Sequence, residues 1–213
     1  MMKRLSAVLA LAIFAPMQAQ AIGVEFGYAS WMQDNSGTIA GTTVSPSSSS
    51  PGMIWAEVEH PVPMIPNVRY ASSELSIGGA ANSLNLQFND FVLYYNLWDT
   101  LATVDVGAGI RDMSGSAVVA SVSNAIPSAP VPVVFVNLAG KIPGVGMTVG
   151  YRYTGISQGS SSVSSTELYA NYEIMAGFEA TLGMRDDSVN FDVTDGAIAA
   201  KSSGTFIGVM YKF

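Results

Sequence analysis

The closing stretch of the chain, residues 204–213, limits the possible folds more than any other segment. Successive side chains of an extended strand point to opposite sides. One face of this strand then carries Thr205, Ile207, Val209, Tyr211 and Phe213. A strand that ends on an exposed aromatic residue gains little in water, whereas aromatic rings concentrate where lipid meets water. The stretch therefore predicts a strand with one face toward a membrane.

The first 21 residues have the features of a secretory signal. Lys3 and Arg4 precede an apolar run at residues 5–14, and the small residues Ala19 and Ala21 follow it. This run is about half the roughly 20 residues that a membrane-spanning helix needs. We therefore expect a cleaved signal peptide at residues 1–21 and one domain at residues 22–213.

The composition excludes several classes of protein. The chain has no cysteine, so disulfide and thiol chemistry are absent. No later segment approaches 18 unbroken apolar residues, so helical membrane spans are not expected. Once the signal is removed, seven Lys and Arg residues face 16 carboxylates, which argues against nucleic acid as a partner. Gly107 and Gly109 precede no helix and do not form a phosphate-binding loop, so we expect no cofactor.

The rest of the chain repeats one unit, an alternating run of apolar and small or polar residues followed by a break. Ten such runs lie near residues 22–29, 53–59, 68–75, 84–96, 103–111, 131–141, 147–154, 167–174, 178–185 and 204–213. Their alternation predicts an all-β fold, a transmembrane antiparallel up-and-down β-barrel of ten strands. Eight strands is the alternative if residues 53–59 and 68–75 do not enter the membrane. In the fourth run the alternation slips, which predicts a β-bulge near Asn89 and Asp90.

The breaks between the runs alternate in length. Short turns are expected at residues 60–66, 97–101, 142–146 and 175–177, the first because prolines cannot continue a strand ladder. Longer polar loops are expected at residues 34–51, 112–130, 157–163 and 186–203. The first of these is rich in serine and should be mobile. Bacterial outer-membrane barrels have this arrangement, with short periplasmic turns and longer external loops.

Several segments resemble a family of small outer-membrane β-barrel proteins of gamma-proteobacteria, known as outer-membrane proteins with a Gly-Gly feature. They are the region of Trp31, residues 61–67, 90–95, 98–99, 104–107 and 140–143, and the closing strand. The serine tract near residue 47 departs from that family. The resemblance implies a barrel in the cell outer membrane and brings no established activity. We expect a monomer in contact with lipids and lipopolysaccharide. The closing strand also resembles that of Gram-negative outer-membrane barrels in general, which implies that the barrel-assembly machinery reads Tyr211 and Phe213.

Charged residues fall on the face opposite the apolar one and must point into the barrel. A charge facing lipid at mid-depth costs about 2–4 kcal/mol. The expected lumen network consists of Glu25, Glu57, Arg69, Asp105, Arg111, Arg152, Glu167, Glu173, Glu179 and Arg185. A small barrel is just wide enough for such side chains to fill it. We therefore expect a structural barrel or a narrow passive passage for small solutes, with a largely side-chain-filled lumen.

An enzyme is the alternative from a different class, and we expect none. The chain has one histidine, His60, which lies in the proline-rich turn with no partner for a catalytic triad beside it. Asp186, Asp187, Asp192 and Asp195 form an acidic cluster, but their spacing lacks the glycine and glutamate of a calcium loop. We therefore expect no metal site.

A soluble, lipocalin-like barrel is the remaining alternative. It would place the same apolar face inside and the charged face in water, and periodicity alone does not separate inside from outside. The aromatic residues near the strand ends, including Tyr28, Tyr95 and Phe213, favour lipid on the outside.

Overall fold

The computed structural model describes residues 22–39, 41–62, 64–78, 82–119, 122–158, 161–193 and 196–213. The expected signal peptide lies outside these ranges. The described residues form eleven strands: β1 (Gly23–Ile39), β2 (Thr42–Ser49), β3 (Gly52–Glu59), β4 (Asn67–Gly78), β5 (Ser83–Asp99), β6 (Ala102–Val119), β7 (Val122–Ile142), β8 (Met147–Gln158), β9 (Ser161–Met175), β10 (Phe178–Val193) and β11 (Gly196–Lys212). Among the residues described, no helix is long and apolar enough to cross a membrane.

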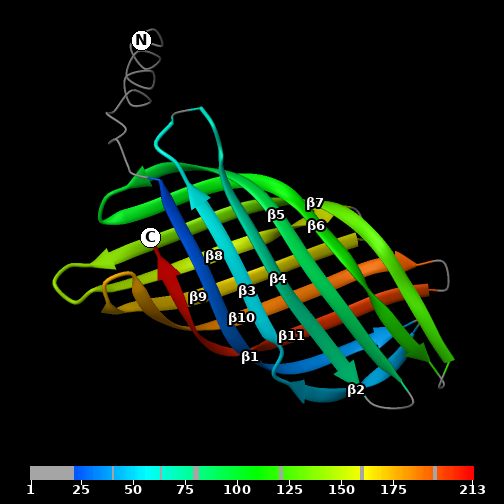
Figure 1. Ribbon diagram of the computed structural model, residues 1–213. Coiled ribbons are helices and arrows are strands. Elements are labelled where there is room, and N and C mark those ends of the chain that lie inside the picture. The colour runs from blue at the N-terminus through cyan, green and yellow to red at the C-terminus, as the bar shows by residue number, and fades with distance from the viewer. Residues whose placement is uncertain are drawn as a thin grey trace, which may run out of the picture.

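The strands form one closed antiparallel barrel, in which β11 pairs with β1 (Figure 1). Both β2 and β3 pair with β1, β3 along residues 23–30 and β2 along residues 33–39. They follow each other along the same side of β1 and together occupy one position in the wall. The wall thus has ten positions, β1 and β3 to β11, and the prediction of a ten-strand antiparallel barrel is confirmed.

The two ends of the barrel differ. One end, the turn end, carries the start of β1 and the C-terminus, since the Phe213 amide donates to the Val24 carbonyl at 2.9 Å. The connections at residues 60–66, 100–101, 143–146 and 176–177 lie at this end, where short turns were predicted. At the opposite end, the hairpin end, consecutive strands are joined within a few residues of each other.

The strands at the hairpin end continue through the segments predicted as long loops, and this prediction is wrong. β6 has 18 residues and β7 has 21, whereas about 9–11 residues suffice to cross a membrane. Segments 112–130, 157–163 and 186–203 are largely strand. The reason is that these residues still alternate, but with the apolar side chains inward and the polar ones outward.

The β5 strand shows this change of polarity. Near the turn end, Phe91 and Leu93 point outward, whereas near the hairpin end the outward side chains include Gln87 and the inward ones are Leu86 and Phe88. The register with both neighbouring strands is continuous here, and the one shift on this strand's pairing with β6 lies between Asn96 and Trp98. The bulge predicted at Asn89 and Asp90 is therefore wrong, because the environment changes there and not the register.

The serine-rich segment 34–51 forms a hairpin with the end of β1 and is not the loop that composition predicted. Val44 is 1% exposed, so the hairpin does have an apolar anchor. Its serines and amides also bridge to β4: the Ser47 hydroxyl accepts from the Gly78 amide at 2.9 Å, and Asn35 donates to the Ser76 carbonyl at 2.8 Å. These contacts replace strand pairing where β2 passes β4 and hold the segment in place.

An apolar core fills the hairpin half of the barrel. Its buried members come from eight wall strands and from β2: Ile39, Val44, Leu75, Ile77, Leu84, Leu86, Phe88, Met113, Ala117, Val133, Val163, Val189, Ile198 and Ala200. On the outer surface of the other half, large apolar side chains are exposed on every wall strand. Examples with exposed fractions from 39% to 59% are Phe26, Ile54, Tyr70, Phe91, Ile110, Val134, Val149, Leu168, Leu182 and Ile207. We call this surface the apolar belt.

Candidate functional site

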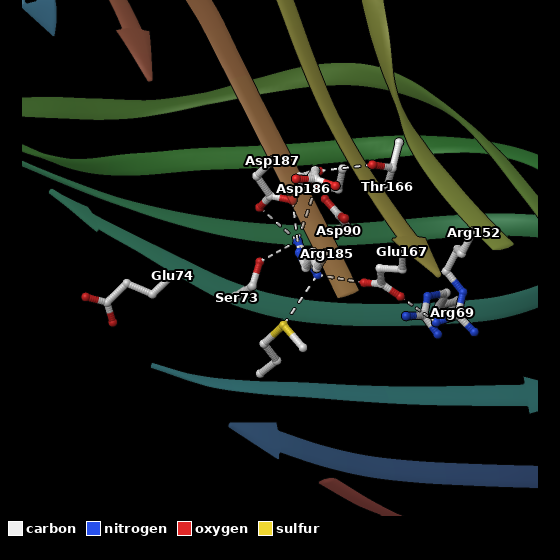
Figure 2. A network of polar contacts seen from close by, with 12 residues as sticks. Arg69, Ser73, Glu74, Asp90, Arg152, Thr166, Glu167, Arg185, Asp186 and Asp187 are labelled. Carbon is white, nitrogen blue, oxygen red and sulfur yellow. Dashed lines mark hydrogen bonds and ion pairs between the residues drawn. The ribbon is translucent and has the colours of Figure 1, made fainter. Parts of the chain in front are cut away.

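A chain of ion pairs crosses the barrel interior between the apolar core and the turn end (Figure 2). In order of contact its members are Asp187, Arg185, Glu167, Arg152, Glu57 and Arg69. Arg152 on β8 lies 2.9 Å from Glu167 and 3.8 Å from Glu57 of β3. Because β8 and β3 are not neighbours in the wall, this contact spans the lumen.

Arg185 is the most connected member of this ion-pair chain. Its guanidinium binds both carboxylate oxygens of Asp187, at 2.9 and 3.1 Å, and one oxygen of Glu167 at 2.8 Å. It also donates to the Ser73 hydroxyl of β4 at 3.0 Å, across the lumen from β10. The side chain lies 5.0 Å from the centre of the buried Trp31 ring. Figure 2 shows Asp187, Glu167 and Ser73 converging on Arg185, with Glu74 pointing away from them.

A second buried pair lies beside this chain. Arg111 donates to both oxygens of Asp90, each at 2.6 Å, and its guanidinium lies 5.3 Å from the Phe88 ring. Such two-point pairs fix the geometry of both side chains. Arg111 is 1% exposed, and among the described residues its charge is balanced by this partner and by the aromatic ring.

The residues expected in the lumen network occupy several levels of the barrel. Glu57, Arg69, Arg152, Glu167 and Arg185 belong to the ion-pair chain, and Arg111 pairs with Asp90. Asp105 accepts a hydrogen bond from Asn137 at 2.8 Å. Glu25 and Glu179 both contact Lys212 at the turn end, at 3.4 and 3.1 Å. Glu173 is exposed near the same end, and no ion pair joins it to another described residue.

Several residues of these networks were missed from the sequence. Asp187 was assigned to an external acidic loop, but it is 3% exposed and pairs with Arg185. The two residues are two positions apart and therefore share a strand face, which is a signal that the sequence does contain. Asp90 and Lys212 also pair with predicted members. Asp105, by contrast, was predicted to belong to the network but forms no ion pair with a described residue.

A cavity of about 250 Å³, which we call the vestibule, lies inside the barrel at the turn end. Its lining includes Glu59, Asp105, Asn137, Asn171 and Arg152. Further into the barrel, around the ion-pair chain, the cavities enclose only about 30 and 10 Å³. A water molecule occupies about 30 Å³ of liquid, so these spaces hold at most one or two waters each.

The single histidine lies at the turn end, in the connection between β3 and β4. Its Nδ1 accepts from the Val62 amide at 3.2 Å, and its Nε2 lies 3.2 Å from the Pro66 carbonyl. Both contacts are within the turn, so the imidazole organises the local backbone. In the part of the chain that the structure describes, no three His, Asp or Glu side chains are grouped closely enough to hold a metal ion.

The closed wall and the apolar belt together define the class of protein. In lipid every backbone polar group needs an internal partner, and a closed barrel supplies one. All ten wall positions expose apolar side chains in the half next to the turn end, and an even strand number is the rule for bacterial barrels. The protein is a transmembrane β-barrel of the outer membrane. Barrels of this class have their short turns on the periplasmic side, so we expect the hairpin end to face the exterior.

Comparisons with known proteins give only distant structural similarities. No family model and no curated protein matches the sequence. Among solved structures, the chain is similar to Neisserial surface protein A, with 11% identity over 91% of this chain and 98% of the other and a TM-score of 0.44. The translocator domain of the autotransporter NalP from Neisseria meningitidis is 10% identical, over 99% of this chain and 96% of the other, with a TM-score of 0.43. The toluene transporter TodX of P. putida is 8% identical, over 95% of this chain and 91% of the other, with a TM-score of 0.36.

Proposed function

We propose that the protein is a non-conducting structural barrel that presents its hairpin end at the cell surface. The observation that carries this proposal is the filled lumen. The external half is occupied by the apolar core, and the ion-pair chain closes the level below it. An open passage would have to cross both levels.

Opening such a lumen by thermal motion would be unfavourable. Exposing one large apolar side chain of the core to water costs about 1.5–3 kcal/mol, and Phe88, Leu86 and Ile77 are each 0–1% exposed. Separating Arg152 from Glu57 and Glu167 would further expose ionised groups inside a narrow, dry space. These costs support a permanently closed barrel over a gated pore.

Planar-bilayer recording tests this proposal. We expect the purified protein to give no discrete current steps at either polarity, while a general porin reconstituted in the same bilayers gives steps. Insertion is checked independently by the heat-dependent gel mobility of folded barrels. Reproducible unitary conductances from correctly inserted protein would overturn the proposal and favour a polar conduit.

We also propose that the barrel is monomeric and catalyses no reaction. The belt continues over all ten wall positions, which leaves no polar gap in it where a second subunit would be required. His60 is engaged within its own turn. Crosslinking in native membranes that captured a dimer, or hydrolysis of lipid A or a peptide by the pure protein, would contradict this proposal.

On the finer family assignment, we infer membership of the Gly-Gly outer-membrane family from the segments quoted above.

The C-terminal aromatic pair is proposed as the signal for barrel assembly. Phe213 is 70% exposed and its ring lies 4.5 Å from Tyr211 and 6.2 Å from Phe26, at the turn end of the wall. Phe213→Ala should slow folding into the outer membrane in cells, with the unfolded form accumulating on gels. The same variant should refold normally from urea into detergent, because it loses recognition and not stability. Equal defects in both assays would refute the signal role.

A further inference from the structure

The vestibule contains acceptor atoms that no described residue satisfies. Asp105 is 4% exposed; its Oδ2 accepts from Asn137, but its Oδ1 has no hydrogen-bond partner among the described residues. Asn171 is 9% exposed, and its Oδ1 is likewise without a partner there. A buried acceptor without a donor is destabilising by about 1–3 kcal/mol. Both residues line the vestibule, so a bound molecule supplies the missing donors once these two covered oxygens turn toward it.

The vestibule is lined by more carboxylates than cationic side chains. Its three cationic side chains are already ion-paired: Lys141 with Asp99, Lys212 with Glu25, and Arg152 with Glu167. Among the described residues, two further lining carboxylates have only neutral partners. Glu59 accepts from the Tyr94 hydroxyl at 3.0 Å, and Asp105 accepts from Asn137.

We propose that the vestibule binds a small organic cation with several N–H donors, such as a short aliphatic diamine. One ammonium group gives Asp105 its counter-charge and a donor, a second gives Glu59 its counter-charge, and a further N–H donor meets the free acceptor of Asn171. A volume of 250 Å³ lies just below the usual range for ligand pockets and fits a molecule of this size. The Asn137 side chain, held by Tyr169 at 2.8 Å, fixes the position of Asp105.

Other ligands fit the vestibule less well. An anion would meet unpaired carboxylates, and every lining cation already has an ion partner, although the Arg152 Nε has no hydrogen-bond partner among the described residues. A bare metal ion would need a closely grouped ligand set, which the described residues do not provide. Lipid is also disfavoured, because the cavity lies inside the strand wall and the ligand would enter from the aqueous turn end.

Isothermal titration calorimetry with 1,4-diaminobutane tests this proposal on the full chain folded in detergent. Saturable one-to-one binding is expected, with no heat from succinate under the same conditions. Asp105→Asn and Glu59→Gln should each weaken binding roughly tenfold or more. Glu74→Gln is the matched control, since this exposed carboxylate lies on the outer face of β4 near the opposite end. Gel mobility confirms that each variant is folded.

The absence of saturable binding would overturn the proposal. So would equal binding of succinate, or affinities that Asp105→Asn leaves unchanged or that Glu74→Gln lowers as strongly. The titration needs no membrane and measures no current. A conductance result that contradicted the closed barrel would therefore leave this test unaffected.

Discussion

Replacing Arg185 with methionine is the sharpest test of the ion-pair chain. The variant removes the partner of Asp187, which is 3% exposed and would keep its charge without a cation. Glu167 retains Arg152 at 2.9 Å, so one carboxylate and not two is left uncompensated. Breaking a buried pair by removing one partner costs about 3–5 kcal/mol. We expect Arg185→Met to lower the free energy of unfolding by that amount.

The double variant Arg185→Met, Asp187→Leu separates an orphaned charge from lost packing. Replacing both members of a buried pair by apolar residues is often nearly neutral, so the second substitution should recover at least about 2 kcal/mol. Urea unfolding of the folded barrel, followed by tryptophan fluorescence, measures both values. Lys201→Met is the control, because Lys201 is exposed on β11 and its loss should change stability by less than about 0.5 kcal/mol. A double variant as unstable as the single one would refute this reasoning.

Two further predictions test the belt and the inner wall. Leu182→Arg should lower the free energy of unfolding in lipid vesicles by about 2–4 kcal/mol. Asn190→Arg lies on the same outward face of β10 but near the hairpin end, so it should be nearly neutral. Equal losses of stability in the two variants would place the membrane elsewhere. Gly27→Ala should be destabilising by about 1–3 kcal/mol in urea unfolding, because its Cβ would lie 2.0 Å from the Trp55 ring. Gly140→Ala meets no atom within 4 Å and should be tolerated, so similar losses in both glycine variants would contradict the packing argument.

The membrane-crossing part of the fold could be predicted from the sequence because lipid imposes a strict rule. Each crossing strand must alternate, and the turns between crossings are marked by local chemistry, such as the prolines of residues 60–66. The pairing partners inside the lumen could be predicted less well. Arg185 and Asp187 share a strand face, yet Glu57 and Arg152 meet across the barrel, and no spacing in the sequence encodes that contact.

The hairpin half was misread because its residues alternate with the opposite polarity. In β10, Leu182 and Met184 face outward, but beyond them Asp186 and Asn190 take the outward face and Val189 turns inward. If apolar side chains are assumed to face outward throughout, this segment does not fit a strand and is assigned as a loop. Water on the outside makes the same segment a good strand, with its apolar side packed in the core.

The two alternatives that periodicity left open therefore both describe this chain, each over a different length of barrel. Near the turn end lipid is the outer solvent, so apolar side chains face out and the charges pair inside. Near the hairpin end water is the outer solvent, and the apolar side chains pack inside as in a soluble barrel. The change falls between Asn89 and Phe91 on β5, and between Met184 and Asp186 on β10. Since one continuous wall carries both halves, the hairpin half is a folded extension of the barrel, and under the proposed function its core is what keeps the lumen closed.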